Sequence, residues 1–173
     1  MENYSVLMSV YYKEQAENLR EAIDSILNQT VKTNEFIIVK DGPLTEKLDN
    51  TIKEYVEEYP GVFKIVTLKK NMGLAKALNK GIEQCSNEII ARMDSDDISM
   101  PDRMERQLEA MEANRADILS GTIVEFDESV DKPTAKRELP EKNEQIIEFA
   151  KKRSPFNHPA VMYKKSAVLK SGL

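Results

Sequence analysis

Short apolar runs alternate along the chain with longer segments whose apolar residues recur every three to four positions. The apolar runs end at polar or glycine-containing turns and predict strands at residues 5–11, 35–39, 62–68, 88–93, 117–125 and 160–163. The periodic segments predict helices at residues 17–27, 44–59, 74–84, 101–114, 143–152 and 164–170. This alternation is typical of βαβ units, so we predict an α/β fold with a Rossmann-like, mainly parallel sheet flanked by helices.

Two remaining segments carry no clear period. Residues 126–141 are polar and contain two prolines, which favours a loop or an irregular hairpin. Residues 154–159 contain two more prolines and predict a constrained loop. The 173 residues suffice for one hydrophobic core, and we find no repeat or linker, so we predict a single domain over residues 1–173.

The net charge, the cysteine count and the lengths of the apolar runs limit which kinds of partner and which cellular compartment we expect. The net charge of -5 argues against a broad electrostatic footprint for nucleic acid, although a local basic patch stays open. The single cysteine, Cys85, excludes an intrachain disulfide and is more simply a buried, inert thiol than a nucleophile. We find no secretory signal and no apolar run near the roughly 20 residues that span a bilayer. We therefore expect a cytoplasmic protein, and peripheral contact with the inner face of a membrane stays open.

Three carboxylates follow the apolar run at residues 89–93 within four positions: Asp94, Asp96 and Asp97. Ligands of open α/β sheets bind outside the carboxyl ends of strands, and clustered carboxylates repel one another unless a cation or proton offsets them. Mg²⁺ and Mn²⁺ prefer such oxygen ligands, so we predict a divalent cation that carries a phosphate-bearing substrate. The alternative is that Asp94 or Asp97 caps the helix after Pro101, which explains one acid but not three.

Polar turns after the other predicted strands would meet at the same edge of the sheet. Asp41 ends the second strand and either accepts hydrogen bonds from a base or ribose or forms an Asx-turn with its own downstream backbone. Tyr11 either flanks a base or closes the core. Residues 69–76 place lysines around a turn into a helix N-terminus, which suits a diphosphate, although a solvated lysine pair explains them as well.

His158, the one histidine, either ligates a metal, contacts a phosphate or has a structural role. Neither a P-loop nor a Gly-x-Gly-x-x-Gly turn is present, which lowers support for nucleotide hydrolysis of the P-loop type and for dinucleotide binding. A sugar-phosphate nucleotidyltransferase would need a glycine-rich basic loop after the first strand. Residues 11–15 contain no glycine, so this alternative ranks lower.

Several ordered segments together resemble inverting family 2 glycosyltransferases with the GT-A (nucleotide-diphospho-sugar transferase) fold, and most closely bacterial polysaccharide glycosyltransferases of the amylovoran-biosynthesis type. The resemblance runs from residue 4 to the last residue. Its marks are SVLMSVY (5–11), SILNQT (25–30), FIIVKDG (36–42), NMGLAKALNKG (71–81), ARMDSDDISMPDR (91–103) and NHPAVM (157–162).

The resemblance implies a metal-dependent transfer of sugar from a nucleotide-diphosphate donor, with UDP favoured, to a saccharide or lipid-linked acceptor in cell-surface polysaccharide synthesis. It implies Mn²⁺ or Mg²⁺ as cofactor. Asp96 would ligate the metal, and Asp94 would contact the ribose, the sugar or the metal. His158 would support the metal site or line the acceptor side. The nucleoside would be bound by Ser9, Tyr11, Asp41 and Asn71.

The chain departs from the family pattern in two places. Lys40 stands where the family often has an acid, which leaves the donor base open. The acidic pair that supplies the general base in similar enzymes does not occur before Leu173, so we expect the base beyond this residue and a domain truncated at its C-terminal end. An alternative for the chain as given is a donor-binding module without catalysis.

Overall fold

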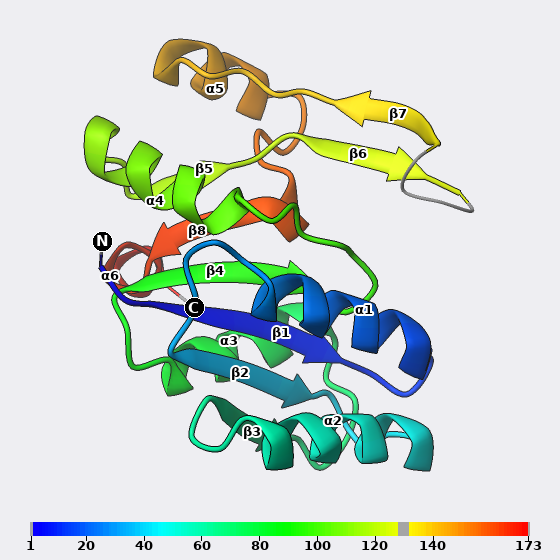
Figure 1. The fold of residues 1–173 in the computed structure, drawn as a ribbon. Coiled ribbons are helices and arrows are strands. Elements are labelled where there is room, and N and C mark those ends of the chain that lie inside the picture. Colours follow the sequence, from blue (N-terminus) through cyan, green and yellow to red (C-terminus); the bar gives the residue numbers. More distant parts are fainter. Residues whose placement is uncertain (1, 128–131, 173) are drawn as a thin grey trace.

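A computed structural model describes residues 2–127 and 132–172 and shows an α/β fold built on a six-stranded sheet (Figure 1). The strand order is β3-β2-β1-β4-β8-β5. The strands of this sheet are β1 (Tyr4–Val10), β2 (Glu35–Lys40), β3 (Phe63–Thr67), β4 (Ile89–Asp94), β5 (Ile118–Ser120) and β8 (Val161–Lys164). The helices are α1 (Ala16–Leu27), α2 (Glu46–Glu58), α3 (Leu74–Gln84), α4 (Arg103–Asn114), α5 (Asn143–Ala150) and α6 (Lys165–Ser171).

The first four strands of the sheet, β3, β2, β1 and β4, run parallel, and β8 runs antiparallel between β4 and β5. The predicted mainly parallel sheet is therefore confirmed. The carboxyl ends of β1, β2 and β4 lie at one edge, and the start of β8 lies at that same edge because its direction is reversed. The loops after these strands and the segment before β8 consequently meet there.

Alternating side chains divide the core between the two faces of the sheet. On one face, β1 contributes Val6, Met8 and Val10 to a cluster with α1, α2 and α4. On the other face, Leu7 packs with residues of α3. Gly81 of α3 lies so close to the sheet that an added Cβ would be 2.2 Å from the Leu7 side chain. Helices thus flank both faces, as the sequence predicts.

The single strand predicted at residues 117–125 is wrong, because the chain changes sheets at Gly121. β5 pairs with β8, whereas β6 (Ile123–Phe126) pairs with β7 (Pro133–Arg137) in a separate two-stranded sheet. The N–H of Gly121 donates to the Ala160 carbonyl at 3.1 Å, and its carbonyl accepts from the Asn157 amide at 3.0 Å. These bonds tie the break to the segment before β8. Of residues 126–141, for which we predict a loop or an irregular hairpin, 133–137 form β7, which pairs with β6 in an irregular register. Residues 128–131 of that segment lie outside the described part.

The helix predicted from Pro101 begins two residues later, at Arg103. Gln29, 1% exposed just after α1, supplies the early hydrogen bonds of this region. Its side-chain oxygen accepts from the Met104 N–H at 3.0 Å, and its amide donates to the Met100 carbonyl at 2.8 Å. The loop that carries the acidic residues is thereby anchored to the end of α1. Within residues 2–127 and 132–172, no helix has the length and apolar character to cross a membrane.

Candidate active site

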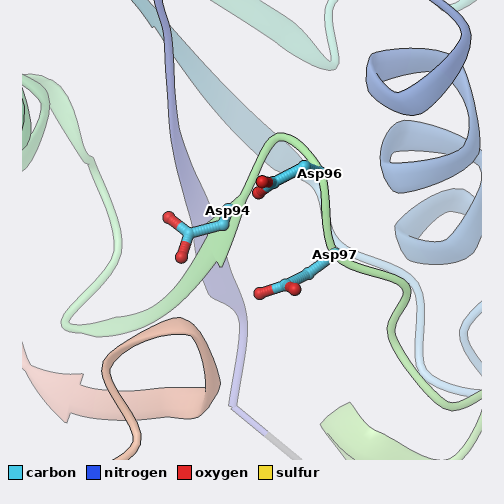
Figure 2. A group of neighbouring side chains, drawn as sticks. All are labelled: Asp94, Asp96 and Asp97. Carbon is cyan, nitrogen blue, oxygen red and sulfur yellow. The ribbon is translucent and has the colours of Figure 1, made fainter. Parts of the chain in front are cut away.

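The three predicted carboxylates gather at the carboxyl end of β4. Asp94 is the last residue of the strand, and Asp96 and Asp97 lie on the turn that follows (Figure 2). One carboxylate oxygen from each can be chosen so that all three atoms lie within 4.8 Å of one another. At the start of α4, the Met104 N–H donates to the side chain of Gln29, and the N-cap residue Asp102 makes no side-chain cap. The alternative that Asp94 or Asp97 caps this helix is therefore wrong.

Repulsion and burial raise the affinity of this cluster for positive charge. Burial, followed by the charges of Asp94 and Asp96, raises the pKa of Asp97 to about 6. Asp96 is exposed at the surface, and its pKa is also raised, first by partial loss of hydration and then by the nearby carboxylates of Glu14 and Asp94. Among the described residues, neither Asp96 nor Asp97 has an ion-pair partner. Oxygen donors in this state suit a hard divalent cation such as Mg²⁺ or Mn²⁺, so the residues present fit the predicted metal.

Asp94 differs from the other two because it forms an ion pair with Arg92. Residues two apart on a strand project to the same face, so the guanidinium of Arg92 points toward the same side as the Asp94 carboxylate. Arg92 is only 1% exposed. Arg103 does not pair with the cluster; it donates to the main-chain carbonyl of Arg92 at 2.8 Å and to the side chain of Gln107 at 3.0 Å. These two arginines make the wall of the cluster basic.

Glu14, in the loop after β1, is a contact of the site that sequence reasoning missed. The hydroxyl of Ser95, between the two predicted metal-site acids, donates to Glu14 at 2.8 Å. The other oxygen of Glu14 accepts from the Gln15 N–H at 2.8 Å and the Asn18 amide at 3.3 Å. The adjacency of β1 and β4 brings the two loops together, and the sequence signals it only through the convergence of strand ends.

Asp41 holds the turn after β3. It is 3% exposed, and its two oxygens accept the N–H groups of Met72 at 2.7 Å and Gly73 at 3.0 Å. The Asx-turn alternative is therefore wrong, because the carboxylate bonds a turn 31 residues downstream. Asn71 caps the same turn, with its side-chain oxygen accepting from Gly73 at 3.2 Å. Gly42 makes the close approach possible: its φ is +91°, and a Cβ there would lie 2.6 Å from a backbone nitrogen of the turn.

Ser9 and Tyr11 lie between these two groups of residues because β1 lies between β2 and β4. Ser9 is opposite Asp94 in the β1–β4 register and opposite Val39 in the β1–β2 register. Tyr11 follows the strand, is 42% exposed and packs edge-on against Tyr12 with ring centroids 6.0 Å apart. The structure thus places Ser9 beside the acidic cluster and an exposed aromatic ring just beyond the strand end.

His158 begins the 3₁₀ helix His158–Ala160 that precedes β8. Burial and the charge of Arg92 lower its pKa, and Asp94 opposes them, so the ring lies within the electrostatic reach of that ion pair. The residue before it, Asn157, is buried, and its side chain donates to the carbonyls of Gly121 and Arg137, which fixes the position of this segment. The reversed direction of β8 therefore brings the one histidine to the edge of the sheet where the acidic cluster lies. Its function there stays a prediction.

Comparison with known proteins agrees with this arrangement. The family model described as "Glycosyl transferase family 2" matches residues 5–171, which span all the site residues above. The chain belongs to glycosyl transferase family 2. It shares 43% identity over 170 residues with the amylovoran biosynthesis glycosyltransferase AmsE of Erwinia amylovora, covering 98% of this chain and 62% of that protein. The predicted family is confirmed.

A second relative of this family 2 chain is the UDP-Gal:alpha-D-GlcNAc-diphosphoundecaprenol beta-1,3-galactosyltransferase of Escherichia coli. It is 40% identical over 170 residues, which cover 98% of this chain and 61% of that protein. The chain thus spans about three fifths of the length of these two curated relatives.

Solved structures confirm the GT-A glycosyltransferase fold. The mannosyltransferase PcManGT of Pyrobaculum calidifontis, in complex with GDP-Man and Mn²⁺, matches with a TM-score of 0.71 at 16% identity, over 99% of this chain and 47% of that one. S. aureus TarS 1–349 in complex with UDP matches with a TM-score of 0.69 at 18% identity, over 98% of this chain and 48% of that one. At these identities the likeness concerns the fold.

Proposed function

We propose that this family 2 chain is the donor-binding domain of a metal-dependent, inverting glycosyltransferase. Its donor is a nucleotide-diphospho-sugar, and its acceptor is a saccharide or a lipid-linked saccharide of cell-surface polysaccharide synthesis. The observation that carries the proposal is the acidic cluster, whose three carboxylates converge within 4.8 Å at the carboxyl end of a parallel strand. In open α/β sheets this edge is where ligands bind.

Each group of site residues has a part in this proposal. Asp96 is the proposed principal ligand of Mn²⁺ or Mg²⁺, with Asp94 and Asp97 beside it. When bound there, the cation would neutralise the charge that develops on the leaving diphosphate. Ser9 and Tyr11 face the nucleoside from the end of β1. The proposed donor side continues to the turn of Asp41 and Asn71.

In this proposal Asp41 contributes to donor binding partly by holding the turn of residues 71–73 and partly by accepting a hydrogen bond from the nucleobase. Both of its oxygens already accept backbone N–H groups, so the turn of residues 71–73 is held in place before the donor arrives. A carboxylate has about four lone-pair sites, so a nucleobase N–H can still be accepted once the turn is set. We favour uracil as that base, and Lys40 is the neighbour through which base preference would change.

The acceptor class is proposed from the relatives. One takes part in amylovoran biosynthesis, and another is named for a diphosphoundecaprenol-linked acceptor. A lipid-linked acceptor would bring the enzyme to the inner face of a membrane. Inversion in one step requires a base that deprotonates the acceptor hydroxyl during attack on the anomeric carbon. The expectation that this base follows Leu173 stays a prediction.

Calorimetry of donor-nucleotide binding tests the metal role. We expect UDP to bind in the presence of Mn²⁺, and to bind at least about tenfold more weakly without it or in Asp96→Ala, since even outer-shell changes at metal sites cost about 10–100-fold. Asp102→Ala is the matched control, because Asp102 pairs with exposed Arg106 outside the cluster. Equal affinity of Asp96→Ala and the parent protein would exclude the metal role. GDP in place of UDP tests the preferred base.

Transfer itself is tested on the full-length gene product. Release of UDP from a UDP-sugar with the acceptor present identifies a glycosyltransferase. Binding of the donor without turnover by that protein would favour the non-catalytic donor module instead. Anomeric NMR of the product distinguishes inversion from retention.

A further inference from the structure

A guanidinium buried in the sheet next to the acidic cluster is not accounted for by donor or acceptor binding. Arg92 lies opposite Leu7 in the β1–β4 register and is 1% exposed. Its neighbours two positions away on β4 are Ile90, which is in the apolar cluster with α3, and Asp94. A charged group on such a face is costly unless it is paired, so its presence there calls for a reason.

The partners of this guanidinium are few. One terminal nitrogen, Nη2, pairs with Oδ1 of Asp94. The other two nitrogens, Nε and Nη1, are buried without a hydrogen-bond partner in the part of the chain that the structure describes. Arg103 bonds the main-chain carbonyl of Arg92 and therefore does not satisfy the guanidinium. Asp94 is thus the one carboxylate at ion-pair distance from this buried charge among the described residues.

The ion pair between Arg92 and Asp94 uses one oxygen of the Asp94 carboxylate and leaves the other free to bind a cation. One oxygen is held by the buried guanidinium, while 29% of the side chain remains accessible and one of its oxygens lies within 4.8 Å of oxygens of Asp96 and Asp97. Asp96 and Asp97 have no such anchor among the described residues. Metal sites need ligands held within about half an ångström, and partners behind the ligands supply that order.

We propose that Arg92 is a positioning residue, which holds one oxygen of Asp94 so that the other faces the cation site with Asp96 and Asp97. This inference rests on the proposed function and adds to it the residue that orders the cluster before any cation binds. Arg92 itself touches neither donor nor cation in this scheme.

A charge effect and a positioning effect of Arg92 predict opposite changes in Mn²⁺ affinity when Arg92 is replaced. If its positive charge merely offsets the cluster, its removal increases the attraction for a cation, and Mn²⁺ binds more tightly. If it orders Asp94, its removal frees the carboxylate to adopt other rotamers, and Mn²⁺ binds more weakly. The direction of the change therefore decides between the two functions.

The experiment measures Mn²⁺ affinity by electron paramagnetic resonance in the parent chain, Arg92→Met, Arg92→Lys and the control Arg106→Met. Arg106 is an exposed arginine whose partner Asp102 lies outside the cluster. We expect about a 10-fold loss for Arg92→Met, partial rescue by Arg92→Lys and no change for Arg106→Met. We also expect Asp94→Asn and the double variant Arg92→Met/Asp94→Asn to bind equally, because Arg92 acts through Asp94. Equal or tighter binding by Arg92→Met would overturn the inference.

Circular dichroism establishes that each variant is folded, and a second measurement needs no substitution. The ¹⁵N–¹H resonances of the Arg92 guanidinium in the parent chain should shift as Mg²⁺ fills the site, and their constancy at saturation would also overturn the inference. The two proposals fail differently. No Mn²⁺ binding by the parent chain refutes the metal site and with it the inference, whereas Mn²⁺ binding that Arg92→Met leaves unchanged or strengthens refutes Arg92 alone.

Discussion

Removal of the Asp94 carboxylate is expected to destabilise the protein far more than removal of its neighbour Asp96. The Arg92 side chain is 2% exposed and the Asp94 side chain 29%. Breaking a buried ion pair from one side costs about 3–5 kcal/mol because the remaining charge is left buried and unpaired. Asp94 is partly solvated, and water can enter its place, so we expect about 2–3 kcal/mol for Asp94→Ala.

The assay is urea unfolding followed by circular dichroism in the presence of a chelator, so that no divalent cation contributes. For a domain of this size the expected loss corresponds to a melting temperature lower by about 4–12 °C. Asp96→Ala serves as the internal comparison. Asp96 is exposed and its carboxylate is disfavoured by Glu14 and Asp94, so its loss should change the unfolding free energy by less than about 0.5 kcal/mol or raise it slightly.

A double-mutant cycle isolates the pair. Arg92→Met/Asp94→Ala removes both charges, and we expect it to recover most of the stability that Asp94→Ala loses, with a coupling energy of about 2 kcal/mol. Either of two results would show that the Arg92–Asp94 pair does not stabilise the fold: an Asp94→Ala variant as stable as Asp96→Ala, or a double variant whose loss equals the sum of the single losses.

Three further predictions concern the elements around the cluster. Gly42→Ala should lower the free energy of unfolding by about 2–3 kcal/mol, because a φ of +91° and a Cβ only 2.6 Å from the backbone both oppose a side chain. Gly61→Ala, at φ +84° but with open space around it, should lower it by about 1 kcal/mol in urea unfolding. Equal losses would contradict the close approach at Gly42. Without divalent cation, Asp97→Asn should raise the unfolding free energy at pH 7 by about 1–2 kcal/mol, after allowance for solvent screening of a half-buried group. Because the pKa of Asp97 is raised, its protonated form contributes to folding stability fully below about pH 4, and this contribution is lost as pH rises through about 6. The unfolding free energies measured in urea at pH 4 and pH 7 should therefore differ less in Asp97→Asn than in the parent chain. An unchanged difference would exclude the Asp97 carboxyl as the source of the pH dependence. Gln29→Ala should cost about 2–4 kcal/mol, because it leaves the buried Met104 N–H and the partly buried Met100 carbonyl without their side-chain partner. Exposed Asn28→Ala should be nearly neutral by the same assay, and similar losses would show that the Gln29 bonds do not anchor the loop.

The order and type of most elements were predictable from the chain because the relevant patterns are local. Buried strands and amphipathic helices each show their own period within about ten residues, and the first four strands and helices occur where that period indicates. The failure at residues 117–125 has a tertiary cause. The apolar pattern continues through Gly121, but bonds to Asn157 and Ala160, nearly forty residues later, end one strand and send the chain into another sheet.

The acidic cluster was similarly accessible from the sequence, since Asp94, Asp96 and Asp97 lie within four positions and follow a recognisable strand. The resemblance to family 2 glycosyltransferases added Ser9, Tyr11, Asp41 and Asn71 as candidates. The partners of these residues were not accessible. Nothing local indicates that Arg92 would be buried with two unpaired nitrogens or that Glu14 would accept a bond from Ser95 across 81 residues.

The α/β fold was therefore predictable from the periodicity of single elements, and the carboxylate cluster and the resemblance to family 2 from short motifs within them. Packing was needed to show which carboxylate Arg92 anchors, that Asp41 holds the turn of residues 71–73, and that His158 lies at the same edge of the sheet as the cluster. These outcomes depend on strand order and on the reversed direction of β8. Both are properties of packing among segments far apart in the chain.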